Sequence, residues 1–111
     1  MIFCNLGSGS KGNSTYLRGE GGAILIDQGF SLKNLTERMQ LANLSPEDVT
    51  AIVVSHEHFD HIKGVGVFAR RFRIPVFCTE LTHRAILPEL IQKVQIETFT
   101  AGDILEINDI R

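Results

Sequence analysis

The sequence predicts an α/β fold, in which short strands and amphipathic helices form layers around one core. Short apolar runs such as residues 51–54 are typical of buried strands, and between them lie stretches whose apolar residues recur with helical spacing. The order is strands first, then helix, strand, helix and strand. A chain of 111 residues allows one domain at most. Its composition, 43% hydrophobic and 22% charged, is that of an ordinary globular protein.

The first part of the chain predicts three strands and a helix. We expect strands at residues 2–6, 15–18 and 23–26, the last two joined as a hairpin by the glycine-rich connection at 19–22. Ser31 is the expected N-cap of a helix, whose apolar stripe consists of Leu32, Leu35, Met39 and Ala42. Ser45 and Pro46 then open a short helical turn.

The second part predicts alternating helices and strands. After the strand at 51–54, a helix from Ile62 carries the stripe Ile62, Val65, Phe68, Ala69 and Phe72. A strand at 75–78 leads to Thr79, the expected cap of a helix from Glu80 that Pro88 interrupts. Further strands are expected at 94–99 and from 104 to 107. Because residues 107–111 show neither a helix cap nor a polar tail, we expect the chain to stop in mid-fold.

Charge and cysteine content exclude some classes. A net charge of −2 and a pI near 6.0 give no global attraction to nucleic acid or to an anionic membrane, so any polyanion must be bound locally. Cys4 and Cys78 lack CxxC spacing and predict buried thiols in a reducing compartment. The N-terminus does not resemble a signal peptide, and no apolar run approaches a membrane span. We therefore expect a cytoplasmic protein with no membrane partner.

Three histidines and two carboxylates lie together directly after the buried strand, in the stretch Ser55-His56-Glu57-His58-Phe59-Asp60-His61. In an extended chain, residues i and i+2 point to the same side, so His56, His58 and Asp60 can converge on one ion, and His61 turns toward it as the helix begins. Imidazole and carboxylate are ligands of zinc and similar divalent metals. The alternative is a polar turn in which Asp60 only caps the following helix. The density of ligands favours a metal site.

These features resemble the metallo-β-lactamase fold hydrolases. The pattern His56-x-His58-x-Asp60-His61 matches their histidine motif, and residues 24–29, an apolar strand ending in Asp27 and Gly29, look like their earlier motif. The opening Leu6-Gly7-Ser8-Gly9-Ser10-Lys11-Gly12-Asn13-Ser14 is similar to the YycJ/WalJ-like branch, which is related to nucleases. The resemblance implies the N-terminal half of an αββα sandwich: a mixed sheet with flanking helices, in one partial domain over residues 1–111.

The resemblance also implies a role for each matching residue. His56 and His58 would bind a first divalent ion, zinc or manganese, and Asp60 and His61 a second. Asp60 would in addition be catalytic, orienting the attacking water, and Asp27 would hold a ligand histidine in place. For Asp27 the alternative is a plain turn at the end of a strand. Glu57 and Phe59 occupy variable positions of the motif. His83 matches no ligand position and is expected at the surface.

The implied substrate is a phosphodiester in DNA or RNA. Backbone N–H groups and side chains of the Gly/Ser loop, namely Ser8, Ser10, Lys11 and Asn13, are candidates to bind a phosphate, although a flexible hairpin connection fits the same residues. Residues 70–73, Arg-Arg-Phe-Arg, are either a second phosphate contact or a solvated helix face. A thioester or lactone hydrolase on the same fold, or a fragment without activity, remains the alternative. An apolar sheet face left open by a half-sandwich would favour self-association.

Overall fold

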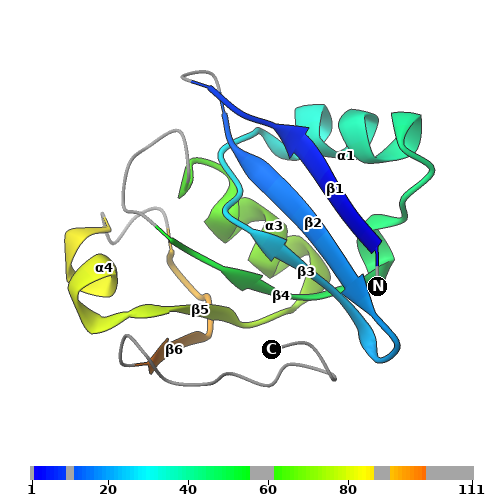
Figure 1. The fold of residues 1–111 in the computed structure, drawn as a ribbon. Coiled ribbons are helices and arrows are strands. Elements are labelled where there is room, and N and C mark those ends of the chain that lie inside the picture. Colours follow the sequence, from blue (N-terminus) through cyan, green and yellow to red (C-terminus); the bar gives the residue numbers. More distant parts are fainter. Residues whose placement is uncertain (1, 10–11, 56–61, 87–90, 100–111) are drawn as a thin grey trace.

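The computed structural model describes residues 2–9, 12–55, 62–86 and 91–99, and within them a six-stranded mixed sheet. The strands are β1 (Ile2–Gly7), β2 (Ser14–Gly19), β3 (Gly22–Ile26), β4 (Val49–Val53), β5 (Val76–Thr79) and β6 (Ile96–Phe99), and they lie in the sheet in that order. The pairs β1–β2 and β2–β3 are antiparallel, whereas β3–β4, β4–β5 and β5–β6 are parallel. This arrangement confirms the predicted α/β class (Figure 1).

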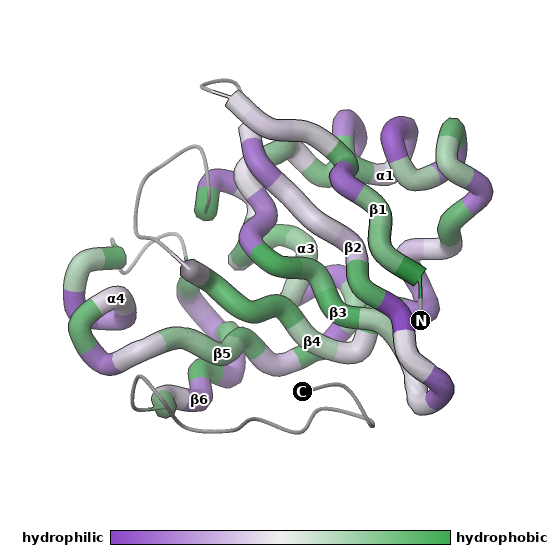
Figure 2. Tube along the Cα trace, viewed as in Figure 1, coloured by the Kyte–Doolittle hydropathy of each residue, from purple (hydrophilic) through white to green (hydrophobic). Residues whose placement is uncertain are grey.

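Two helices, α1 (Leu32–Leu41) and α3 (Val65–Phe72), lie behind the sheet in the view of Figure 1. They bury their apolar sides against the sheet, through Leu35 and Met39 from α1 and Phe68 from α3. The strands at the centre, β3 and β4, are the most continuously apolar, as Figure 2 shows. Parallel strands are typically rich in apolar residues because other elements cover the faces of the sheet. The main core therefore lies between the sheet and these two helices.

The helix caps form where the sequence predicts them. Ser31 Oγ accepts a hydrogen bond from Asn34 N (3.2 Å) at the start of α1. Thr79 Oγ1 accepts one from Thr82 N (3.3 Å) at the start of α4 (Glu80–Ala85), the helix that directly follows β5. A short 3₁₀ helix, η1 (Pro46–Asp48), forms the predicted turn before β4. The hydroxyls of Ser31 and Thr79 each accept a hydrogen bond from a backbone N–H that would otherwise lack a partner at the helix N-terminus. Ser45, the N-cap of η1, makes no such bond.

Some predicted boundaries were wrong. Ala42 is exposed and ends α1 as its C-cap instead of extending the buried stripe, because the chain turns through Asn43 at φ 59°. The helix expected from Ile62 is observed as α3, which starts at Val65 after Gly64. The last described strand, β6, begins at Ile96, two residues later than expected. The Pro88 break and the expected strand at 104–107 lie outside the described residues.

The opposite face of the sheet carries a second, smaller apolar cluster. Its members are all strand residues, Ile24 and Ala51 at the centre and Leu17, Ile26, Val53 and Phe77 around them. The register places Phe3, Leu17, Ile24 and Ala51 in one row across four strands. Phe3, at the edge, is 70% exposed. Self-association through this face stays a prediction.

The two cysteines are free, Cys78 buried and Cys4 partly buried. Burial raises the pKa of the Cys78 thiol, and the neighbouring Glu80 charge adds to this, so the thiol stays protonated and unreactive. Among the helices that the structure describes, none is long and apolar enough to cross a membrane.

Candidate metal centre

The candidate site lies at one edge of the sheet, where β3 and β4 both end. These strands are parallel neighbours, and Ile26 pairs with Val53 at their last residues. Asp27 follows β3 directly, and Ser55 follows β4 after Val54. Because the carboxyl ends of parallel strands meet at one edge, the residues that follow them are placed side by side. In open α/β sheets this edge is where ligands bind.

Asp27 holds the end of β4. Its two carboxylate oxygens accept hydrogen bonds from Ser55, Oδ1 from the backbone N (2.7 Å) and Oδ2 from Oγ (2.5 Å). Its own backbone N donates to Val53 O (2.8 Å). The residue is buried and has φ 64°, a left-handed conformation that aspartate tolerates better than most residues. Ser55 immediately precedes His56, so Asp27 fixes the point at which the histidine motif leaves the sheet.

Gln28 holds the other end of the motif. Its backbone O accepts a hydrogen bond from Gly64 N (2.8 Å), and its side-chain Nε2 donates to Phe30 O (2.8 Å) and Gly64 O (3.4 Å). Phe30 N returns a bond to Gln28 Oε1 (2.9 Å). The side chain is fully buried, yet each of its polar atoms has a partner. Gly64 is the N-cap of α3, so Gln28 fixes the start of that helix.

We call Asp27 and Gln28 together the strand-end clamp. The two residues are consecutive, and one binds the residue before the motif while the other binds the glycine three residues after it. Each bond is made inside the fold, where a broken partner is costly. The clamp therefore fixes Ser55 and Gly64, the described residues on either side of the segment that carries His56, His58, Asp60 and His61.

The Gly/Ser loop is tied to the same edge. Ser14 Oγ donates to Asp27 O (2.9 Å), and Gly29 N donates to Asn13 O (2.9 Å). Within the loop, the Asn13 side chain bonds Gly9 in both directions, accepting from its N (3.1 Å) and donating to its O (2.8 Å). These bonds bring the loop beside the clamp and give Asn13 a role in shaping the loop.

The structure describes some of the predicted site residues and not others. His56, His58, Asp60 and His61 lie outside the described residues, as do Glu57, Phe59, Ser10 and Lys11. Ser8 is exposed at the end of β1, and Asn13 and Asp27 lie at the clamped edge. The expectation that Asp27 holds a histidine also falls on undescribed residues, while its bonds to Ser55 are established. His83 is partly buried in α4, after β5.

Gln28 and Gly64 were missed in the sequence analysis. The sequence patterns assign no role to Gln28, which follows the strand-end aspartate, or to Gly64, which lies within the predicted helix. Gly64 itself could have indicated this role, since a glycine within a helical pattern often has a packing reason such as the close approach of another backbone. A Cβ placed on Gly64 would lie 1.9 Å from Phe30 O and 2.4 Å from Gln28 Nε2.

The donor set fits a divalent metal. Among the residues that the structure describes, no group of three or more His, Cys, Asp or Glu lies together, so these residues supply no rival metal site. Three imidazoles and an aspartate lie within residues 56–61, between two clamped ends. Neutral nitrogen and carboxylate oxygen donors are those that zinc and neighbouring divalent ions prefer.

Comparison with known proteins agrees with this fold. The family model described as Metallo-beta-lactamase superfamily matches residues 7–108. The chain belongs to the metallo-β-lactamase superfamily.

Two curated relatives point to one branch of that superfamily. Exodeoxyribonuclease YycJ of Bacillus anthracis is 39% identical over 113 aligned positions, covering 99% of this chain and 42% of the relative. Exodeoxyribonuclease WalJ of Streptococcus pneumoniae serotype 2 is 44% identical over 81 positions, covering 73% of this chain and 30% of the relative. The resemblance to the YycJ/WalJ-like branch is confirmed. The chain spans less than half the length of these relatives.

Solved structures show the same fold at low identity. A B3 metallo-beta-lactamase with an active-site glutamic acid superposes with a TM-score of 0.75 at 14% identity, over 96% of this chain and 46% of that one. MEM-A1, a B3 enzyme from a soil metagenome, gives 0.75 at 20% identity, over 95% and 46%. These likenesses confirm the predicted fold class.

Replacing Asp27 by asparagine is expected to lower the free energy of unfolding by about 2 kcal/mol, because a hydrogen bond to a charged group contributes about 1.5–3 kcal/mol. Asparagine tolerates the same left-handed backbone, so the change removes the charge and replaces one acceptor oxygen with an amide donor while leaving the backbone conformation accessible. Urea titration measures the loss, and amide exchange should show faster opening at Ser55 N. The matched control is Asp48→Asn, whose exposed ion pair with Arg18 (2.8 Å) should contribute less than about 1 kcal/mol. Equal losses in the two variants would contradict a special role for Asp27.

Proposed function

We propose that the protein is a metal-dependent phosphodiesterase that acts on nucleic acid, as an exodeoxyribonuclease. The observation that carries the proposal is the strand-end clamp, which holds both ends of a His-x-His-x-Asp-His segment. Support comes from the relatives, which are named exodeoxyribonucleases. Catalytic groups need positioning to a fraction of an ångström, and a segment fixed at both ends is suited to this.

The proposed roles follow the donor chemistry. His56 and His58 would hold one divalent ion and Asp60 and His61 a second, with zinc or manganese as the candidates. When bound, such ions supply Lewis acidity and make water a nucleophile at neutral pH. Asp60 would in addition orient that water, and Asp27 would keep the imidazoles in place through the end of β4.

The Gly/Ser loop is the proposed contact for the phosphate near the reaction. It lies beside the clamp through the bonds of Ser14 to Asp27 and of Gly29 to Asn13. Ser8, Ser10 and Lys11 would offer hydroxyl and ammonium donors, and Asn13 would set the shape of the loop. Successive backbone N–H groups in such a loop favour an anion.

The test is a nuclease assay after complete chelation. Purified protein treated with a chelator should leave an end-labelled DNA strand intact, and adding Mn²⁺ or Zn²⁺ should restore stepwise shortening from one end. Single-stranded DNA, duplex DNA and RNA identify the preferred nucleic acid. A protein that hydrolyses a thioester or lactone but no phosphodiester, with either ion, would overturn the proposal and favour the alternative hydrolase class.

A further inference from the structure

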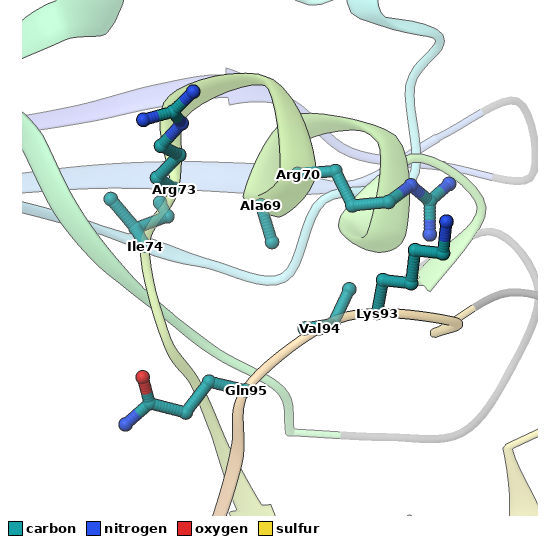
Figure 3. A pocket seen from close by; sticks show the side chains of 7 residues that line it. All are labelled: Ala69, Arg70, Arg73, Ile74, Lys93, Val94 and Gln95. Carbon is teal, nitrogen blue, oxygen red and sulfur yellow. The ribbon is translucent and has the colours of Figure 1, made fainter.

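A second cationic feature lies away from the metal motif, at the far end of α3. A pocket of about 400 Å³ opens between that helix end and the turn before β6. It is lined by Ala69, Arg70, Arg73, Ile74, Lys93, Val94 and Gln95. Figure 3 shows Arg70 reaching from the helix and Lys93 from the turn toward the same side. Three of the seven lining residues are cations and none is acidic, in a chain whose net charge is −2.

Among the residues that the structure describes, no acidic side chain forms an ion pair with these three cations. Within residues 2–9, 12–55, 62–86 and 91–99, the ion pairs are Arg18–Asp48 and Arg84–Glu80, and neither involves the pocket. Arg70 donates one hydrogen bond from Nη1 to Gln92 O (2.7 Å), which fastens the turn to the helix and leaves its charge unneutralised. Figure 3 shows Arg70 and Lys93 extending to the same side and Arg73 to the other. Like charges on one side of a cavity repel one another unless an anion lies between them.

The backbone adds an independent observation. Arg73 ends α3 at φ 56° and Lys93 lies at φ 59°, both in the left-handed region. At a helix C-terminus this position favours glycine, and asparagine is the next best choice. The chain instead has a long cation at each of two left-handed positions that line one pocket. The helix dipole favours a cation at Arg73 but gives no reason for one at Lys93, which belongs to another element.

We propose that this pocket binds a backbone phosphate of the nucleic acid strand, several nucleotides from the bond that is cleaved. The inference rests on the proposed function. Gly64, the N-cap of α3, lies beside the clamp, and the helix rises about 1.5 Å per residue, so its C-cap Arg73 lies roughly 13 Å farther along the axis. A strand rises about 3.4 Å per nucleotide, so the separation corresponds to about four nucleotides. The pocket contributes to strand affinity and leaves the chemistry to the motif.

The experiment measures binding without cleavage. A fluorescein-labelled single strand of DNA, about 20 nucleotides long so that it exceeds one ordinary site size, is titrated in chelator and followed by anisotropy at several salt concentrations. The test variant is Arg73→Asn/Lys93→Asn, which removes two charges and keeps residues suited to the left-handed backbone. The matched control is Lys33→Gln/Arg84→Gln, which removes two exposed charges outside the pocket. Urea unfolding of each variant shows that the fold is kept.

The pocket variant should bind about tenfold more weakly at low salt. Its plot of log affinity against log salt should flatten by about 0.7, since the pocket makes one phosphate contact and each such contact on a single strand contributes about 0.7. The control should keep the wild-type slope. Equal slopes for pocket variant and wild type, or no binding of DNA by the wild type, would overturn the proposal. Intact binding without metal-dependent cleavage would instead reject the proposed function, so the two failures are distinguishable.

Discussion

Replacing Gly64 by alanine is expected to lower the free energy of unfolding by about 3 kcal/mol or more. The added Cβ would lie 1.9 Å from Phe30 O and 2.4 Å from Gln28 Nε2, against about 3.5 Å for an ordinary contact. Relief requires α3 to move away from the loop after β3. That movement breaks the bond from Gly64 N to Gln28 O (2.8 Å).

The magnitude follows from two costs. Overpacking a core position costs about 1–3 kcal/mol. A buried polar side chain left without its partners, here that of Gln28, costs about 1–3 kcal/mol more. Their sum is a large fraction of the 5–15 kcal/mol that holds a typical domain folded. The fraction folded at 37 °C should therefore fall measurably.

The measurement is urea unfolding followed by circular dichroism, with Val67→Ala as the matched control on the same helix. Val67 is 45% exposed, and alanine is a good helix former, so this change should stay within about 0.5 kcal/mol. If Gly64→Ala unfolds at the same urea concentration as Val67→Ala, the close approach of α3 to Phe30 and Gln28 is not as described.

The fold was predictable because local signals agreed with one another. The strands at the centre are short, apolar and bounded by turn residues, and Ser31 and Thr79 cap their helices as expected. Boundaries were harder to predict, because they depend on contacts between elements. Val65 begins α3 because Gly64 is held in a non-helical conformation by Gln28, a residue 36 positions earlier. No pattern local to either residue contains that contact.

The sequence suggests candidate ligands for the site, but it does not indicate which residues hold the two ends of their segment. Histidine and aspartate at alternating positions have a chemical meaning that spacing alone reveals. The support consists of single hydrogen bonds between distant residues, such as Ser55 to Asp27 and Gly64 to Gln28. A glutamine has no distinctive role in sequence, and its importance here comes from complete burial with every polar atom paired. Such roles depend on tertiary structure.

Replacing His58 by alanine is expected to weaken divalent metal binding by more than about 100-fold, because changes to the partners of ligands alone already cost 10–100-fold. The fold should persist without metal, since the bonds of Asp27 to Ser55 and of Gln28 to Gly64 do not involve His58. Metal content after dialysis, measured by elemental analysis, should fall while the unfolding transition of the metal-free protein stays unchanged.

The control for this prediction lies one residue away. Glu57→Ala changes a carboxylate at a variable position of the same motif and should keep its metal. If Glu57→Ala and His58→Ala lose metal equally, the loss reflects disturbance of the segment and the ligand assignment fails. If neither loses metal, the ion is bound elsewhere. Loss in His58→Ala alone, with both metal-free proteins equally stable, separates the ligands from the clamp that positions them: the clamp maintains the fold, and the histidines bind the ion.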